Sequence, residues 1–185
     1  LNQFNLIRDQ SYQNTFTVLQ PQEFVVDFGG LNTVGRNVIG VLQGTETGAG
    51  IILIGAHYDS ITRDYENGNT FAPGANDNAS GISALLEIAR VMSQRPHRAT
   101  VMFVAFGAEE IQRKGSIAFV NDYLRANNIQ IDAMFNMDVI GSSTSGTGGV
   151  NDYTIRLFSA EPNESSSRHL ARTLNLLASR LAPGM

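Results

Sequence analysis

Three short apolar runs without polar alternation constrain the fold of this 185-residue chain more than any other feature. They occupy residues 51–55, 100–106 and 133–137. A strand that is apolar on both sides is expected to be covered on both faces, as in a parallel sheet. Two of these apolar runs are followed by segments in which apolar residues recur at helical spacing, residues 80–94 and 116–126. Strands alternating with helices predict a three-layer α/β/α domain, with a mostly parallel central sheet and helices on both faces.

The remaining segments complete this outline as a single domain over residues 1–185. Residues 1–20 are rich in Asn and Gln with weak periodicity, and they are interpreted as a loosely structured lead-in. Residues 61–78 form a long connection of the kind that is usually functional. Four further elements are predicted: strands at 23–28, 37–42 and 153–158, and a helix at 167–181.

Composition and charge exclude several classes of function. The content is 42% hydrophobic and 16% charged, as in a soluble globular protein, and the net charge of −4 argues against a nucleic-acid partner. No apolar run is long enough to cross a bilayer, and no basic block predicts membrane binding. The absence of cysteine excludes a thiol nucleophile and a Cys-based zinc site.

The first residue is Leu1, and no signal peptide is present in the sequence. The chain is therefore expected to be a processed form or a fragment. The lack of cysteine is compatible with export, and a secreted or periplasmic location is expected. The sequence leaves the oligomeric state open.

Acidic residues and one histidine follow the three apolar strands. His57 and Asp59 come after the first, Glu109 and Glu110 after the second, and Asp138 after the third. Asp77 precedes the helix that begins near residue 80. Because ligand sites in such sheets lie beyond the carboxyl ends of the strands, all six are expected at one edge.

Each of these residues also has an ordinary structural interpretation. Asp77 could be a turn residue, the paired glutamates could favour a helix dipole, and Asp138 could begin a loop. Several carboxylates at one edge, however, repel one another unless a cation neutralises them. One imidazole and several carboxylates suit Zn²⁺ and are compatible with Mn²⁺ or Co²⁺. The pattern predicts a hydrolytic metal site.

The adjacent glutamates can divide the work at such a site. Consecutive side chains leaving a strand point in different directions, so one can bind metal while the other acts as general base toward a metal-activated water. The carboxylate of Asp59 can accept the second ring N–H of His57, which would fix the tautomer of the imidazole.

Four segments of the sequence resemble the M28 family of metallopeptidases, the co-catalytic zinc aminopeptidases. They are "GAHYDS", "APGANDNASG", "AFGAEE…GS" and "NMDVIG", which occur in family order within roughly residues 35–185. The resemblance implies a phosphorylase/hydrolase-like α/β/α fold and two zinc ions in a complete member. It also implies a cis peptide bond between Asp77 and Asn78.

The resemblance assigns a role to each residue of the predicted site. His57 and Asp138 would hold one zinc, Asp77 would bridge both ions, and Glu110 would hold the second zinc. Glu109 would be the general base, and Asp59 would orient His57.

The chain departs from the family pattern in two places. Residues 111–114 are more polar than the family's, which would alter the rim of the pocket. The family's second-zinc histidine lies beyond the equivalent of residue 185, so the chain is expected to be truncated at its C-terminus. His97 precedes a strand at the opposite edge of the sheet, and His169 is expected on the surface of the last helix. One zinc or none is therefore expected in this chain.

The leading functional hypothesis is a zinc aminopeptidase or related exopeptidase that hydrolyses N-terminal peptide bonds of a peptide substrate. A non-catalytic peptidase-like module or an inactive fragment is one alternative. A glutaminyl-cyclase-like enzyme is another, although those enzymes use one zinc and differ from "GANDNASG". The preferred substrate side chain, and the choice between aminopeptidase, dipeptidase and carboxypeptidase, stay open.

Overall fold

The computed structural model describes residues 1–62, 64, 70–151 and 154–182 of the chain. It divides into two compact units, Leu1–Gly141 and Ser142–Met185, which are described separately. That both belong to one peptidase domain stays a prediction. Among the described residues, no helix combines the length and the apolar character needed to cross a membrane.

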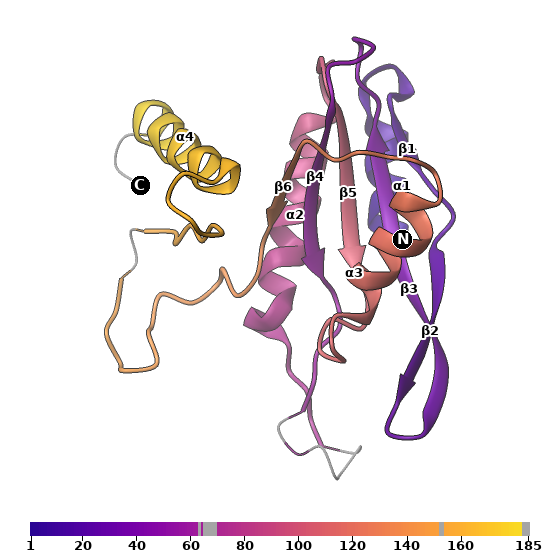
Figure 1. The fold of residues 1–185 in the computed structure, drawn as a ribbon, viewed down its shortest axis with the longest axis vertical. Helices are drawn as coiled ribbons and strands as arrows, with labels where there is room; N and C mark the ends of the chain where they lie inside the picture. The colour runs from indigo at the N-terminus through magenta and orange to yellow at the C-terminus, as the bar shows by residue number, and fades with distance from the viewer. Residues whose placement is uncertain (63, 65–69, 152–153, 183–185) are drawn as a thin grey trace. The chain divides into compact units, whose positions relative to one another are not determined.

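The first unit contains a six-stranded mixed sheet (Figure 1). The strand order is β1-β3-β5-β4-β6, and β2 pairs with β3 outside this path. The strands are β1 (Phe16–Val18), β2 (Gln22–Phe28), β3 (Leu31–Leu42), β4 (Ile51–His57), β5 (Thr100–Phe106) and β6 (Ala133–Asn136).

The sheet is less parallel than the sequence predicts. Strands β4, β5 and β6 are parallel, whereas β3 pairs antiparallel with β1, β2 and β5. One physical reason is the tight turn between β2 and β3. Gly29 and Gly30 have φ angles of 57° and 81°, as a two-residue hairpin turn requires, and a hairpin makes its strands antiparallel neighbours.

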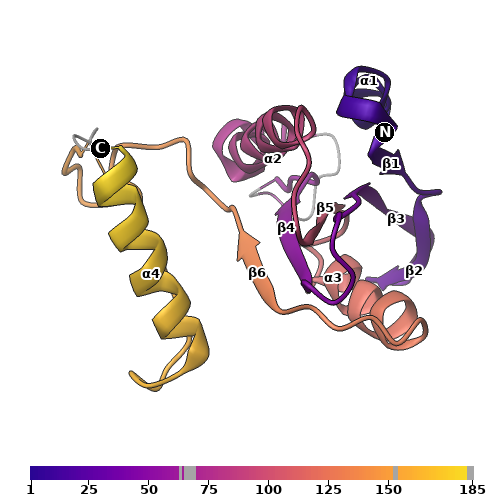
Figure 2. The ribbon, with the colours of Figure 1, turned by 90° about the horizontal axis from the view of Figure 1, so that it is seen from above.

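Helices cover both faces of this sheet, as predicted. Figure 2 shows α1 (Asn2–Gln10) and α2 (Ser80–Met92) on one side, and α3 (Lys114–Ala118) on the other. Helix α3 continues directly into a wider helical segment, Phe119–Arg125. Three layers therefore form within residues 1–141.

Alternate residues of the apolar strands enter two separate cores. Ile54 and Phe103 pack with Leu85 of α2 on one face. Leu53 and Met102 pack on the opposite face in the cluster that includes Phe119. The absence of polar alternation in β4 and β5 is explained by this burial on both sides.

The interpretation of residues 1–20 as a loosely structured lead-in is wrong. Phe4 and Ile7 of α1 are buried, and Phe16 of β1 is 1% exposed. The ring of Phe16 lies 5.8 Å from that of Phe4 and 5.9 Å from that of Phe103, measured between centroids. A few apolar residues among Asn and Gln give little periodicity, and their burial depends on partners from β3, β5 and α2.

The second unit differs from the sequence prediction in one element. The described residues 154–158 form no strand, and Tyr153 lies outside the described residues. The predicted helix is confirmed as α4 (Ser166–Leu181), and the side chain of Ser165 caps it by accepting the N–H of Arg168. Residues 142–150 contain a turn and one isolated bridge, between Thr144 and Val150.

Candidate metal centre

His57 is the last residue of β4 and is almost fully buried, with 2% of its surface exposed. Its pairing partner in the parallel neighbour β5 is Phe106, the last residue of that strand, and Asn136 ends β6 opposite Gly55. Because the three strands run in the same direction and end together, the segments that follow them meet at one edge of the sheet.

Two carboxylates reach the outer nitrogen of the His57 ring. Nε2 of His57 lies 3.0 Å from Oδ1 of Asp77 and 3.3 Å from Oδ1 of Asp138. One ligand atom from each of the three residues lies within 4.8 Å of the others. The side chains of Asp77 and Asp138 are 53% and 42% exposed, so the group is buried on the histidine side and open to solvent on the other.

The inner nitrogen of the ring faces Asp59. Nδ1 of His57 lies 3.1 Å from the main-chain carbonyl oxygen of Asp59 and 3.6 Å from its carboxylate Oδ1. A neutral imidazole whose Nδ1–H donates to this carbonyl presents the lone pair of Nε2 to a cation. The predicted contact with the carboxylate of Asp59 is therefore longer than the contact with its main chain.

The carboxylate of Asp59 has two other partners. Its oxygens accept the main-chain N–H of Glu109 at 3.0 Å and that of Glu110 at 3.1 Å. The segment after β5 that carries both glutamates is thus attached to the segment after β4. These contacts cannot be predicted from the sequence, because a carboxylate gives no local sign of which amides it accepts.

The pKa values at this edge report an excess of negative charge. Burial raises the pKa of the Glu109 carboxyl, and the charges of Asp138 and Asp59 raise it further against the opposing effect of His57. Burial alone would lower the pKa of His57, but the surrounding carboxylates outweigh it and raise that pKa. A site with this charge balance is suited to a bound cation.

Glu110 lies beside the three-residue group rather than within it. Burial and then the charge of Asp77 raise the pKa of the Glu110 carboxyl. Glu110 and Asp77 both line a pocket of about 660 Å³, together with Ile61, Phe71 and Pro73. Glu110 is therefore near Asp77, with a pocket open beside both.

The peptide bond between Asp77 and Asn78 is cis, as the family resemblance implied. Asn78 is 1% exposed, and its side chain joins two loops. Its Nδ2 donates to the carbonyl of Met137 at 3.0 Å, and its Oδ1 accepts the N–H groups of Gly81 and Val139 at 3.0 and 3.3 Å. Asn78 thus holds the segment that contains Asp138 against the start of α2. The sequence pattern predicts no such role for Asn78.

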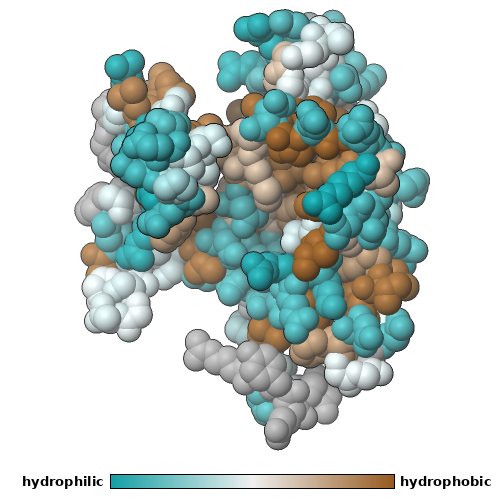
Figure 3. All heavy atoms as spheres, in the orientation of Figure 1, coloured by the Kyte–Doolittle hydropathy of each residue, from teal (hydrophilic) through white to brown (hydrophobic). Residues whose placement is uncertain are grey.

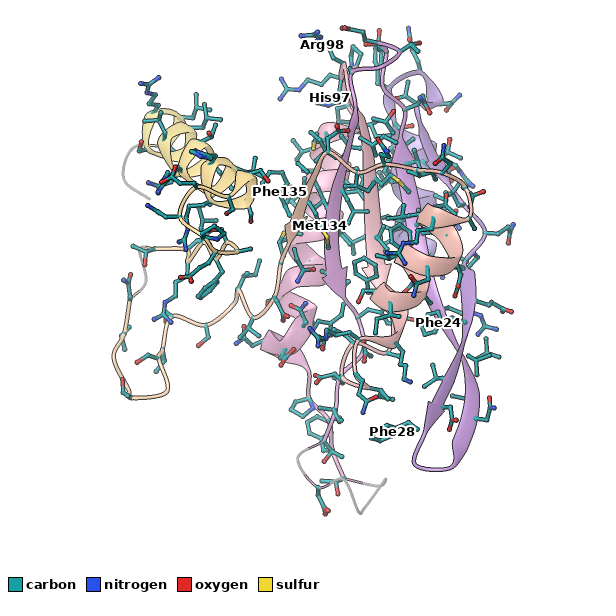
Figure 4. The ribbon with its side chains drawn as sticks, viewed as in Figure 1. Phe24, Phe28, His97, Arg98, Met134 and Phe135 are labelled. Carbon is teal, nitrogen blue, oxygen red and sulfur yellow. The ribbon has the colours of Figure 1, made fainter. Side chains whose placement is uncertain are left out.

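Neither of the other histidines belongs to this group of ligand atoms. Figure 4 shows His97 beside Arg98 at the end of the sheet where β5 begins, opposite the carboxyl edge, and its Nε2 contacts the carbonyl of Met92 at 2.8 Å. His169 belongs to the second unit, where its Nε2 lies 3.8 Å from Oε2 of Glu164.

Comparison with known proteins gives a family match over most of the chain. The sequence model described as "Peptidase family M28" matches residues 37–179. A "Probable zinc metalloprotease" of Pyricularia oryzae is 37% identical over 122 residues, which cover 66% of this chain and 24% of that protein. The chain spans between 24% and 38% of the length of the first curated relatives it matches.

Solved structures share the fold. A zinc aminopeptidase from Bacillus subtilis is 28% identical, with a TM-score of 0.56 over 80% of this chain and 33% of that one. The LapA aminopeptidase of Legionella pneumophila is 24% identical, with a TM-score of 0.64 over 96% of this chain and 43% of that one. At that identity the second similarity concerns the fold alone.

Proposed function

Because the chain belongs to peptidase family M28, we propose that it carries the catalytic site of a zinc-dependent exopeptidase that hydrolyses N-terminal peptide bonds. The observation that carries the proposal is the group formed by His57, Asp77 and Asp138, whose ligand atoms lie within 4.8 Å of one another. An imidazole and two carboxylates are the nitrogen and oxygen donors that zinc takes at catalytic sites.

The residues at this edge fit a divalent cation. The imidazole of His57 is buried and held through Nδ1, so Nε2 faces the two aspartates. His57 and Asp138 would hold one ion with Asp77, and Glu110 with Asp77 would hold a second. When bound, zinc supplies a Lewis acid that polarises a carbonyl and lowers the pKa of water. The complete three-residue group supports one tightly held ion in this chain.

Glu109 is the proposed general base. Its main chain is held by Asp59, next to the proposed ligand Glu110. A carboxylate in this position can accept a proton from the attacking water and return it to the leaving amine. Asp59 is proposed to support catalysis by holding both glutamates and, through its carbonyl, the ring of His57.

The substrate and location form the finer part of the proposal. The open side of the group, where Asp77 and Asp138 are exposed, leaves room for the end of a peptide. The sequence contains no cysteine, which is compatible with a secreted or periplasmic protein. The relatives named as aminopeptidases favour that activity over the dipeptidase and carboxypeptidase alternatives.

The test is Glu109→Gln in this protein. Zinc content per molecule and turnover of an amino-acid p-nitroanilide are measured together. We expect zinc to be retained and turnover to fall by about 10²–10⁴-fold, the usual contribution of general acid–base catalysis. Glu87→Gln on the exposed face of α2 is the matched control and should keep full activity.

Two results would contradict the proposal. A loss below about tenfold in Glu109→Gln would remove Glu109 as the base. A wild-type protein without zinc and without peptidase activity would instead support a non-catalytic module.

A further inference from the structure

The segment after β5 that carries Glu109 and Glu110 is closed at its base by one buried side chain. Asn37 lies in β3, and none of its surface is exposed. Its Oδ1 accepts the N–H of Gly107 at 3.1 Å, and its Nδ2 donates to the carbonyl of Gly115 at 2.9 Å. One side chain therefore joins the first and last residues of the segment 107–115, here called the glutamate loop.

The same side chain is tied to the following helix through Gln22. The Nδ2 of Asn37 also donates to Oε1 of Gln22 at 2.9 Å, and Nε2 of Gln22 donates to the carbonyl of Ala118 at 3.0 Å. Both donors and the acceptor of the Asn37 amide are thus in use. A buried amide that is fully paired in this way holds its partners in one arrangement.

The two ends of the glutamate loop touch. A Cβ atom on Gly115 would collide with the carbonyl oxygen of Gly107 and would lie 2.7 Å from Oδ1 of Asn37. Within the loop, the N–H of Lys114 donates to the carbonyl of Ala108 at 3.0 Å. The close approach of the two ends therefore leaves no room for a side chain at position 115.

The local sequence does not favour the shape of this loop. Ala108, Gln112 and Arg113 have φ angles of 52°, 59° and 58°, a region that residues other than glycine adopt infrequently. Such a conformation persists when surrounding groups determine it. Here those groups are Asn37 at the base and the carboxylate of Asp59 at the main chain of Glu109 and Glu110.

We propose that Asn37 is a positioning residue, which sets the placement of Glu109 and Glu110 by closing the base of the glutamate loop. It acts through main-chain groups and lies outside the group of ligand atoms. Its strand, β3, runs near α3 (Figure 1). Its effect on turnover rests on the proposed function, whereas its effect on the loop does not.

The first experiment measures amide hydrogen exchange of the metal-free chain in Asn37→Ala. Exchange in residues 107–115 should become faster by about tenfold or more, because the base of the loop loses its hydrogen bonds, while β4 and β5 stay protected. Ser93→Ala is the control. Ser93 is also fully buried, and its hydroxyl donates to the carbonyl of Arg90 at the end of α2, away from the loop.

Gln22→Met provides a second variant if Asn37→Ala does not fold. It keeps the length of the side chain and removes one of the two acceptors of the Asn37 amide, together with the bond to Ala118. Exchange in residues 107–115 should be faster than in Ser93→Ala, because the Asn37 amide and the helix after the loop each lose one hydrogen bond.

The second experiment measures kcat, KM and zinc content of the protein. For Asn37→Ala we expect kcat per zinc-loaded molecule to fall about tenfold or more with KM changed less than about threefold, because misplacing a base affects the chemical step. A purely structural role would lower the amount of folded protein and leave kcat per folded molecule unchanged.

The inference is overturned if loop exchange in every foldable variant equals that of Ser93→Ala. It is also overturned if the wild type is active and kcat of the variants stays within about twofold of it. An inactive wild type would contradict the proposed function, and the exchange experiment would then decide the inference alone.

Discussion

Oδ1 of Asp59 accepts the main-chain N–H of Glu109 at 3.0 Å, across a sequence separation of 50 residues. The carbonyl oxygen of Asp59 at the same time faces Nδ1 of His57 at 3.1 Å. The two functional groups of one residue therefore serve two different parts of the site. The carboxylate holds the glutamate loop, and the main chain holds the histidine.

These separate roles of the carboxylate and the main-chain carbonyl of Asp59 predict the outcome of Asp59→Asn. The carboxamide keeps one acceptor for the two amides and leaves the main-chain carbonyl unchanged. We expect turnover of the protein to fall by about 10–100-fold, because the base moves, with the affinity for the zinc held by His57 changed less than about threefold. Zinc affinity is measured by competition with a chelator, and exposed Asp122→Asn is the control.

If the carboxylate instead acts on His57, the result should differ. Loss of a group that orients a metal-binding histidine typically lowers metal affinity by about 10–100-fold. A drop of that size in Asp59→Asn would contradict the division of roles described above.

Zinc should stabilise this chain without any substrate. A ligand that binds only the folded state raises the free energy of unfolding by about 2.7 kcal/mol at 100 times its Kd. Calorimetry should therefore show a rise in Tm with zinc, which excess chelator reverses, and a smaller rise with magnesium, which prefers oxygen ligands.

The same measurement on Asp138→Asn should show little of this rise, because one of three close ligand atoms loses its charge. Asp27→Asn, on the exposed part of the hairpin, should behave as wild type. An equal rise in Tm in both variants would show that zinc binds elsewhere.

Asn78→Ala should be strongly destabilising. It removes three hydrogen bonds from a fully buried position and leaves the main-chain groups of Gly81 and Met137 without that partner. An expected loss of about 2–4 kcal/mol in the free energy of unfolding follows from the cost of orphaned buried polar groups. Denaturant unfolding measures it, and exposed Asn127→Ala, which should cost less than about 1 kcal/mol, is the control.

Phe4→Ala tests whether the first residues belong to the folded core. Phe4 is 2% exposed and packs against Phe16, so its truncation should cost about 3–5 kcal/mol of unfolding free energy. Leu6 lies on the same helix but is 52% exposed, and Leu6→Ala should cost less than about 1 kcal/mol. Equal midpoints for the two variants in denaturant would contradict the burial of α1. Val25 and Val34 on the hairpin are also exposed and should likewise tolerate truncation. Figure 3 shows hydrophobic residues at several places on the visible surface.

Local sequence determined the elements closest to the site. The apolar runs of β4 and β5 are continuous because each strand is covered on both faces. Such a run can be recognised from the sequence alone. His57 and Asp138 follow directly from the rule that polar residues after parallel strands meet at the carboxyl edge. The position of Asp77 beside them depended on the "GANDNASG" segment as well.

Only the tertiary structure decided how these residues are supported. The antiparallel placement of β3, the burial of Phe4 and Phe16, and the contacts of Asn37 with Gly107 and Gly115 join segments far apart in the chain. Hydrophobic periodicity reports only how neighbouring residues share a face. A buried amide instead pairs with main-chain N–H and carbonyl groups, and a carboxylate accepts main-chain N–H groups. Every residue type except proline has both groups, so the partners cannot be recognised from the sequence.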